Sequence, residues 1–178
     1  METLLITLVS MALIIFSTVT MTVSIFQSAN RMADSWKMME KQSGIIRRTE
    51  ITTLPPQDYQ GGAIDLTVQN AGQIDLAEFS RWDVIFQYQS GIACYVTYAA
   101  AYPPGGNQWA VKGIYFSEGV PEVFQPNILN PGENMVVSVN LNPGIGEGEA
   151  GRVTISTPGG VTSQCQVIWP LPPPPPPP

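Results

Sequence analysis

The amino-acid sequence predicts an α+β protein, in which a long N-terminal α-helix is followed by an immunoglobulin-like antiparallel β-sandwich. Three observations lead to this fold class. Residues 3–30 contain no charged side chain, residues from 63 onward alternate between apolar and polar side chains, and Gly, Pro and Asn gather between the alternating stretches. With 178 residues the chain has room for one ordinary globular domain and one extended element.

The apolar run from Leu4 to Phe26 is long enough to span a bilayer as a helix. Only Met1 and Glu2 precede it, whereas a cleaved signal peptide has basic residues, a shorter apolar run and a small-residue cleavage site. We therefore expect the run to be retained. Helix-forming residues continue after it, which predicts a helix to about residue 48. Such a helix is about 70 Å long, far more than a membrane requires.

Apolar or small residues follow one face of this helix at spacings of three and four, beyond the length of a membrane span. They are Leu4, Leu8, Met11, Ile15, Val19, Thr22, Phe26, Ala29, Ala33 and Trp36. Copies of the helix packed together would bury this face, so we expect these residues to pack in the core of a filament. A single-pass membrane anchor with a helical stalk is the alternative.

The prolines at Pro55 and Pro56 predict a change of structure, because they remove backbone donors and favour an extended chain before them. The expected organisation is a helical segment over 1–54, a Pro/Gly linker over 55–62, a β-sandwich over 63–169 and a polyproline tail over 170–178. We expect the tail to form a polyproline helix. It either extends into solvent, docks on an aromatic groove of a neighbouring subunit or carries a modification.

About seven stretches have the alternation of short strands, and turn residues separate them. The predicted strands lie at 64–68, 82–88, 94–98, 109–116, 135–139, 153–155 and 161–169. This number and spacing of strands is typical of an immunoglobulin-like sandwich.

Cys94 and Cys165 are the only cysteines, and the chain has no histidine, which excludes a Cys/His zinc site within one chain. If the sandwich lies outside the cytoplasm, we expect a Cys94–Cys165 disulfide that closes a loop of about 70 residues and stabilises the fold by about 4 kcal/mol. Two buried free thiols are the alternative.

The charge distribution argues against several functions. Residues 51–178 carry ten acidic but only three basic side chains, Arg81, Lys112 and Arg152, which are too few and too dispersed to neutralise nucleic-acid phosphates. The carboxylates form no recognisable catalytic pattern, so we expect no enzyme activity and no cofactor. Glu147 and Glu149 lie in a Gly-rich stretch without the spacing of a calcium loop, and we expect a plain hairpin loop rather than a metal site.

Several motifs narrow the interpretation further. The stretch from Ile64 to Gly72 contains an Asn70-Ala-Gly72 turn, which is followed by Asp75-Leu76 and then by the predicted strand from Trp82 to Phe86. Further along the chain, the motif Asn130-Pro-Gly-Glu133 precedes another predicted strand. A third motif, Thr157-Pro-Gly-Gly160, lies near the end. Together with the apolar N-terminal helix, these motifs resemble those of archaellins and their accessory relatives within the type IV pilin superfamily. The resemblance extends over most of residues 1–169. The sequence lacks the small, Gly-containing start of processed archaellins and the acidic fifth residue of bacterial pilins.

The resemblance implies a structural subunit of an extracellular archaellum-type filament that serves swimming motility. Its partners would be copies of itself, the membrane before assembly, and an assembly platform with its ATPase. An adhesive type IV pilin and a membrane-anchored, stator-like accessory protein are the alternatives. The basic residues after the apolar run would place the sandwich in the cytoplasm by the positive-inside rule, but the β-domain favours an extracellular position. We expect neighbouring sandwiches to touch, with Arg81 and Lys112 contacting acidic loops of the next subunit.

Overall fold

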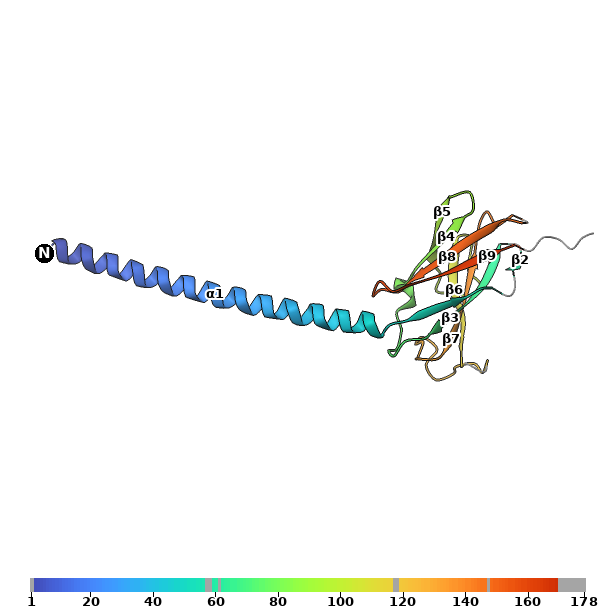
Figure 1. The fold of residues 1–178 in the computed structure, drawn as a ribbon, viewed down its shortest axis with the longest axis horizontal. Coiled ribbons are helices and arrows are strands. Elements are labelled where there is room, and N and C mark those ends of the chain that lie inside the picture. Colours follow the sequence, from blue (N-terminus) through green and yellow to red (C-terminus); the bar gives the residue numbers. More distant parts are fainter. Residues whose placement is uncertain (1, 57–58, 61, 117–118, 147, 170–178) are drawn as a thin grey trace, which may run out of the picture. The chain divides into compact units, whose positions relative to one another are not determined.

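The structure is a computed structural model that describes residues 2–56, 59–60, 62–116, 119–146 and 148–169. The chain forms two compact units, Met1–Gly44 and Ile45–Pro178. Helix α1 (Glu2–Arg48) makes up the first unit and contributes its last turn to the second; Figure 1 shows it as one unbroken helix. The predicted polyproline tail lies outside the described residues.

The second unit contains one short 3-10 helix and nine strands in its described part. In chain order these are β1 (Ile51–Leu54), β2 (Tyr59–Gln60), β3 (Ala63–Asn70), η1 (Phe79–Arg81), β4 (Asp83–Tyr88), β5 (Ala93–Tyr98), β6 (Gln108–Tyr115), β7 (Asn134–Asn140), β8 (Ala150–Ser156) and β9 (Thr162–Ile168). The predicted strands correspond to β3 through β9 with small differences in their ends, which confirms the helix-plus-sandwich fold class.

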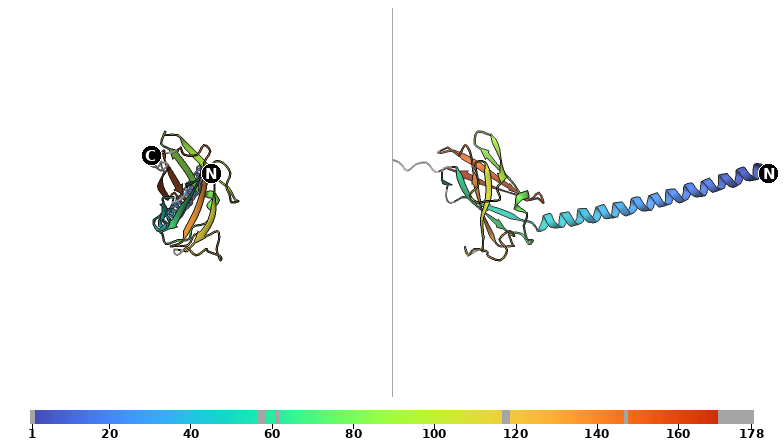
Figure 2. Two further views of the ribbon diagram at one scale, coloured as in Figure 1. Left: turned by 90° about the vertical axis from the view of Figure 1, so that its right-hand side faces the viewer. Right: turned by 180° about the vertical axis from the view of Figure 1, so that it is seen from behind.

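The strands form a sandwich that is almost closed into a barrel (Figure 1, Figure 2). One layer has the order β1-β3-β7-β6, with β2 paired to β3, and the other has the order β5-β4-β8-β9. Two residue pairs of a parallel ladder join β5 to β6, whereas every other strand pair is antiparallel. On the opposite side, the Thr53 amide of β1 donates to the Ser163 hydroxyl of β9 at 2.9 Å.

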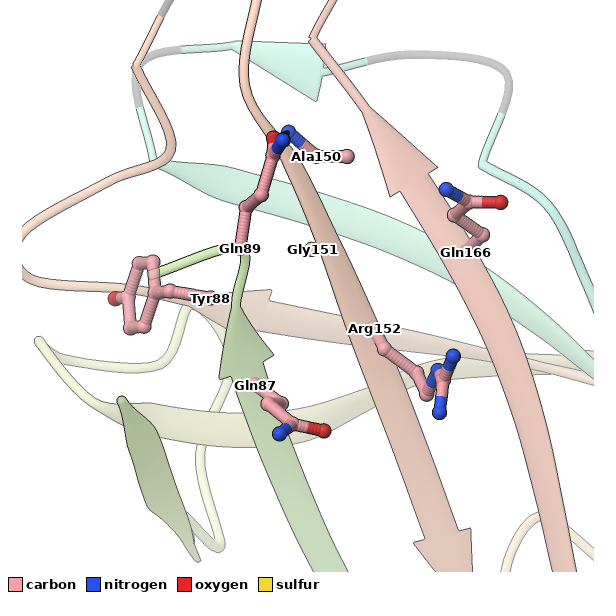
Figure 3. A pocket seen from close by; sticks show the side chains of 7 residues that line it. All are labelled: Gln87, Tyr88, Gln89, Ala150, Gly151, Arg152 and Gln166. Atoms are coloured by element: carbon pink, nitrogen blue, oxygen red, sulfur yellow. Dashed lines mark hydrogen bonds between the residues drawn. The ribbon is translucent and has the colours of Figure 1, made fainter. Parts of the chain in front are cut away.

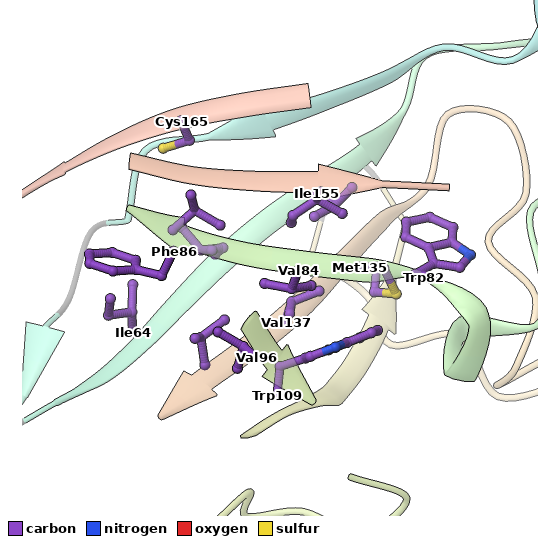
Figure 4. Close-up of a cluster of buried hydrophobic side chains, with 14 of the residues drawn as sticks. Ile64, Trp82, Val84, Phe86, Val96, Trp109, Met135, Val137, Ile155 and Cys165 are labelled. Atoms are coloured by element: carbon purple, nitrogen blue, oxygen red, sulfur yellow. The ribbon is translucent and has the colours of Figure 1, made fainter. Parts of the chain in front are cut away.

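Alternating side chains of both layers fill the space between them. In β3, Ile64, Leu66 and Val68 are fully buried while the intervening residues are half-buried, because successive side chains of a strand point to opposite faces. Figure 4 shows Ile64 of β3 in one cluster with Phe86 of β4, which belongs to the facing layer, and with Trp109 of β6, which belongs to the same layer as β3. The period-two pattern therefore predicted the core positions correctly.

The structure begins the sandwich earlier than we expected. Residues 51–54, which the predicted organisation assigned to the helical segment, form strand β1 and pair antiparallel with 67–70 of β3. Ile51 and Thr53 point inward and are buried, so this segment extends the core. Strand β2 likewise lies within the expected linker. The two prolines follow the first strand rather than the helix, since tertiary pairing decided the structure of 51–54.

The expected Cys94–Cys165 disulfide is wrong, because both cysteines are free. Cys94 lies opposite Phe86, Phe86 opposite Val153, and Val153 opposite Cys165. Strands β4 and β8 therefore separate the two cysteines, and three strand spacings amount to about 14 Å. A disulfide needs Cα atoms within about 7 Å. Burial raises the pKa of the Cys165 thiol, which further lowers its reactivity.

Candidate assembly surfaces

Helix α1 presents an apolar surface on all of its sides along residues 3–30. The ten predicted core-packing residues are all on this helix and all exposed in the single chain; Leu8 and Phe26, for example, are 69% and 66% exposed. Residues on the other sides, such as Ile14 and Phe16, are equally exposed. By length and composition α1 could cross a membrane. A helix that is apolar all round is stable only when lipid or protein covers it.

Six hydroxyl groups of the apolar run in α1 form hydrogen bonds within the helix. The side chains of Thr7, Ser10, Thr18, Thr20, Thr22 and Ser24 each donate to a backbone carbonyl one turn earlier, at 2.7–3.0 Å. Because these donors already have acceptors, burial of the helix in a dry environment leaves none of them unpaired. These six residues are therefore compatible with full burial.

The Asn70-Ala-Gly72 turn holds the segment that leads from the helix into the sandwich. The amides of Ala71 and Gln73 donate to the carbonyls of Glu50 and Arg48 at 3.0 and 2.8 Å. The approach is so close that a Cβ on Gly72 would lie 2.6 Å from the Arg48 oxygen and from the Glu50 nitrogen. This position therefore requires glycine for packing reasons.

The second motif, Asn130-Pro-Gly-Glu133, meets the first in space. The fully buried Asn70 side chain donates to the carbonyls of Ile74 and Leu129 at 2.8 and 2.9 Å and accepts from the Gly72 amide. The buried Glu133 carboxylate accepts from the backbone amide of Asn130 at 2.8 Å. Both motifs thus build one end of the sandwich, and their role is structural.

The loop between β6 and β7 carries the most exposed apolar side chains of the sandwich. Phe124 is 92% exposed and Val123 is 74% exposed. The Glu122 carboxylate accepts from the backbone amides of Phe124 and Gln125 at 2.6 and 3.0 Å, which holds this part of the loop in place. The sequence did not predict this surface, because the loop lacks the regular apolar spacing of a helix or a strand.

Two of the three cations of the sandwich are already paired within their own domain. Arg81 binds Glu78 at 2.7 Å, and Lys112 binds Asp65 at 2.6 Å. The hydrogen bond to Asp65 also raises the pKa of Lys112. These pairs weaken the expectation that Arg81 and Lys112 contact acidic loops of a neighbouring subunit.

Arg152, the third cation, lies in a groove of about 360 Å³ on the outer face of β4, β8 and β9 (Figure 3). Strand register places it between Gln87 of β4 and Gln166 of β9. Gln89, which also lines the groove, accepts from the Ala150 amide at 3.1 Å. Arg152 has no ion-pair partner within the described part of the chain.

The described residues contain no group of three or more His, Cys, Asp or Glu side chains able to hold a metal ion. Glu149 instead accepts a hydrogen bond from the Gly146 amide at 3.2 Å, and Glu147 lies outside the described residues. The expected hairpin loop is wrong, because this loop joins β7 to β8, which do not pair with each other and belong to different layers of the sandwich.

The fold is that of several archaellum structures. The chain is similar to the archaeal flagellum of Methanospirillum hungatei strain JF1, at 13% identity with a TM-score of 0.54 over 90% of each chain. It is also similar to the archaellum periplasmic stator protein FlaG from Sulfolobus acidocaldarius, at 18% identity with a TM-score of 0.51 over 66% of this chain and 98% of that chain. The complex of FlaF and FlaG from the same organism gives the same identity and TM-score over 66% and 88%.

These similarities establish a shared fold with archaellum components, as the sequence motifs predicted. The sandwich unit makes up about three quarters of the chain, so a match over 90% must include part of α1. No protein-family model and no curated protein matches this sequence.

Proposed function

We propose that this chain is a structural subunit of an extracellular archaellum-type filament, polymerised through α1 and used for swimming. The observation that carries the proposal is the length of the apolar surface on α1. Residues 3–30 are free of charge and span about 42 Å as a helix, whereas the hydrocarbon core of a bilayer is about 30 Å thick.

The apolar stripe also continues beyond these residues. Ala33 and Trp36 lie on it and are exposed, and Trp36 is 68% exposed. Full burial of one large apolar side chain contributes about 1.5–3 kcal/mol. Copies of α1 packed side by side would bury the whole stripe, whereas a lone membrane anchor would leave its end in water.

The outer surface supports the same proposal. The exposed Val123 and Phe124 side chains would be covered where neighbouring sandwiches touch, and their loop is already held in place, so contact would cost little ordering entropy. In this proposal the chain resides in the membrane before an assembly platform and its ATPase add it to the filament.

A substitution inside the helix tests polymerisation. In Ile15→Asp an unpaired charge would enter the dry core, at a cost of several kcal/mol, so we expect no filaments in sheared cell-surface material by negative-stain electron microscopy. Ile15→Leu is the matched control and should assemble. Fractionation of the cells verifies that the Ile15→Asp chain still reaches the membrane. Filaments built from Ile15→Asp would contradict the packing role of this face.

A stator-like accessory protein is the second candidate, and the similarity of the sandwich to FlaG favours it. The abundance of the chain separates the two functions. A filament subunit makes up most of the protein in the sheared fibres. An accessory protein instead stays in the cell envelope, in much smaller amounts than the filament protein. Deletion of the gene tests motility: we expect non-swimming cells, and swimming that persists while surface attachment fails would indicate an adhesive pilin.

A further inference from the structure

Among the described residues of 51–169, one cation and one carboxylate have no hydrogen-bond or ion-pair partner, and they lie far apart. Within the described part of residues 51–169, the carboxylates of Asp65 and Glu78 bind cations. The other bonded carboxylates, those of Asp83, Glu122, Glu133 and Glu149, accept hydrogen bonds from a tyrosine hydroxyl or backbone amides. Asp75 is exposed and has neither kind of partner among the described residues. Among the three cations of these residues, only Arg152 likewise has no ion-pair partner within the described part of the chain.

The surroundings of Arg152 suit a carboxylate. Gln87 and Gln166 flank the guanidinium on neighbouring strands, and Figure 3 shows the three side chains along the groove. None of the described residues that line the groove is acidic. A guanidinium presents a planar fork of N–H donors that matches a carboxylate, and each carboxamide adds two further donors. Among the described residues, the groove therefore offers several donors and no competing negative charge.

Asp75 lies at the other end of the domain. It lines a surface depression together with Thr157 and Pro158, which follow the last residue of β8. Arg152 lies near the first residue of the same strand, and five residues of extended chain separate it from Thr157 by about 17 Å. Because an ion pair requires contact within 4 Å, Arg152 and Asp75 cannot pair within one chain in this arrangement.

We propose that the Arg152 groove binds the Asp75 carboxylate of a second copy of this chain. The unpaired charges at opposite ends of one domain are complementary, and their pairing joins different surfaces of the two copies. Contacts of this heterologous kind repeat from copy to copy, and they generate an open helical polymer when the rotation between copies does not close a ring. The proposal rests on the proposed filament function and specifies an electrostatic contact between its outer domains.

A charge swap in the full-length chain tests the contact. Arg152→Glu alone and Asp75→Arg alone place like charges opposite each other, and we expect each to increase the free-subunit fraction of purified filaments about tenfold at low ionic strength. The double variant Arg152→Glu/Asp75→Arg restores opposite charges, and the free fraction should return to within about twofold of wild type. Arg81→Glu is the control of equal charge change, and Asp75→Arg should not rescue it.

The outcomes separate this contact from the proposed function. If wild-type filaments form but the free-subunit fraction of the double variant rises by the combined effects of the two single variants, the Arg152–Asp75 contact is overturned. The filament function then still stands. If only Arg152→Glu weakens the filament, the groove binds a different carboxylate and the pairing is likewise overturned. If the wild-type chain forms no filaments, both proposals fail.

Discussion

Gly72 offers the sharpest test of how the sandwich holds the chain that leaves the helix. In Gly72→Ala the new Cβ would lie 2.6 Å from two backbone atoms, the Arg48 oxygen and the Glu50 nitrogen. Ordinary van der Waals contact begins near 3.4 Å. Backbone atoms cannot rotate away as a side chain can, so the two segments must separate by about 0.8 Å.

This separation would disrupt two backbone hydrogen bonds, from Ala71 to Glu50 and from Gln73 to Arg48, which are now 3.0 and 2.8 Å long. Each contributes about 1 kcal/mol, so with some residual strain we expect Gly72→Ala to lower the free energy of unfolding by about 2–3 kcal/mol. For a domain of this size, that corresponds to a decrease in Tm of about 8 °C.

Thermal unfolding of the full-length chain in detergent, followed by near-ultraviolet circular dichroism of the buried tryptophans, measures this effect. Gly159→Ala is the matched control, because a Cβ there meets only the Thr157 hydroxyl, at 3.8 Å, and the backbone needs no positive φ. We expect its Tm to remain within about 3 °C of wild type. Equal Tm values for the two alanine variants would refute the reasoning from close backbone approach.

Two further predictions concern the cysteines and the Lys112–Asp65 pair. Both thiols should react with maleimide in the denatured chain, and in the native chain at pH 7 Cys94 should react well before Cys165, because burial raises the Cys165 pKa; a denatured chain with no reactive thiol would reinstate the disulfide. Lys112→Met should lower the free energy of unfolding at pH 7 by no more than about 1 kcal/mol, because the ion pair is partly exposed. Since Asp65 raises the Lys112 pKa, this stabilisation is fully present below the unfolded pKa of 10.5 and disappears as the pH rises through the folded pKa. Chemical denaturation measures the difference in the free energy of unfolding between Lys112→Met and wild type, and a difference that grows at high pH would contradict this assignment.

The sequence alone determined the features that depend on local chemistry. A charge-free apolar run followed by helix-forming residues can satisfy its backbone only as a helix, and α1 indeed ends at Arg48 as predicted. The alternation of apolar and polar residues predicted the inward positions of β3, such as Leu66, because successive side chains of a strand point to opposite faces of the sheet. The Asn70-Ala-Gly72 motif indicated a turn in the same way.

Only the tertiary structure decided which distant segments became neighbours. The strand order placed two strands between Cys94 and Cys165, and pairing with β3 converted residues 51–54 from an expected helical segment into β1. It also paired Lys112 with an acid 47 residues away and left Arg152 between two carboxamides. These outcomes depend on strand order and register, which long-range packing selects. The spacing of residues along the chain does not directly predict either of them.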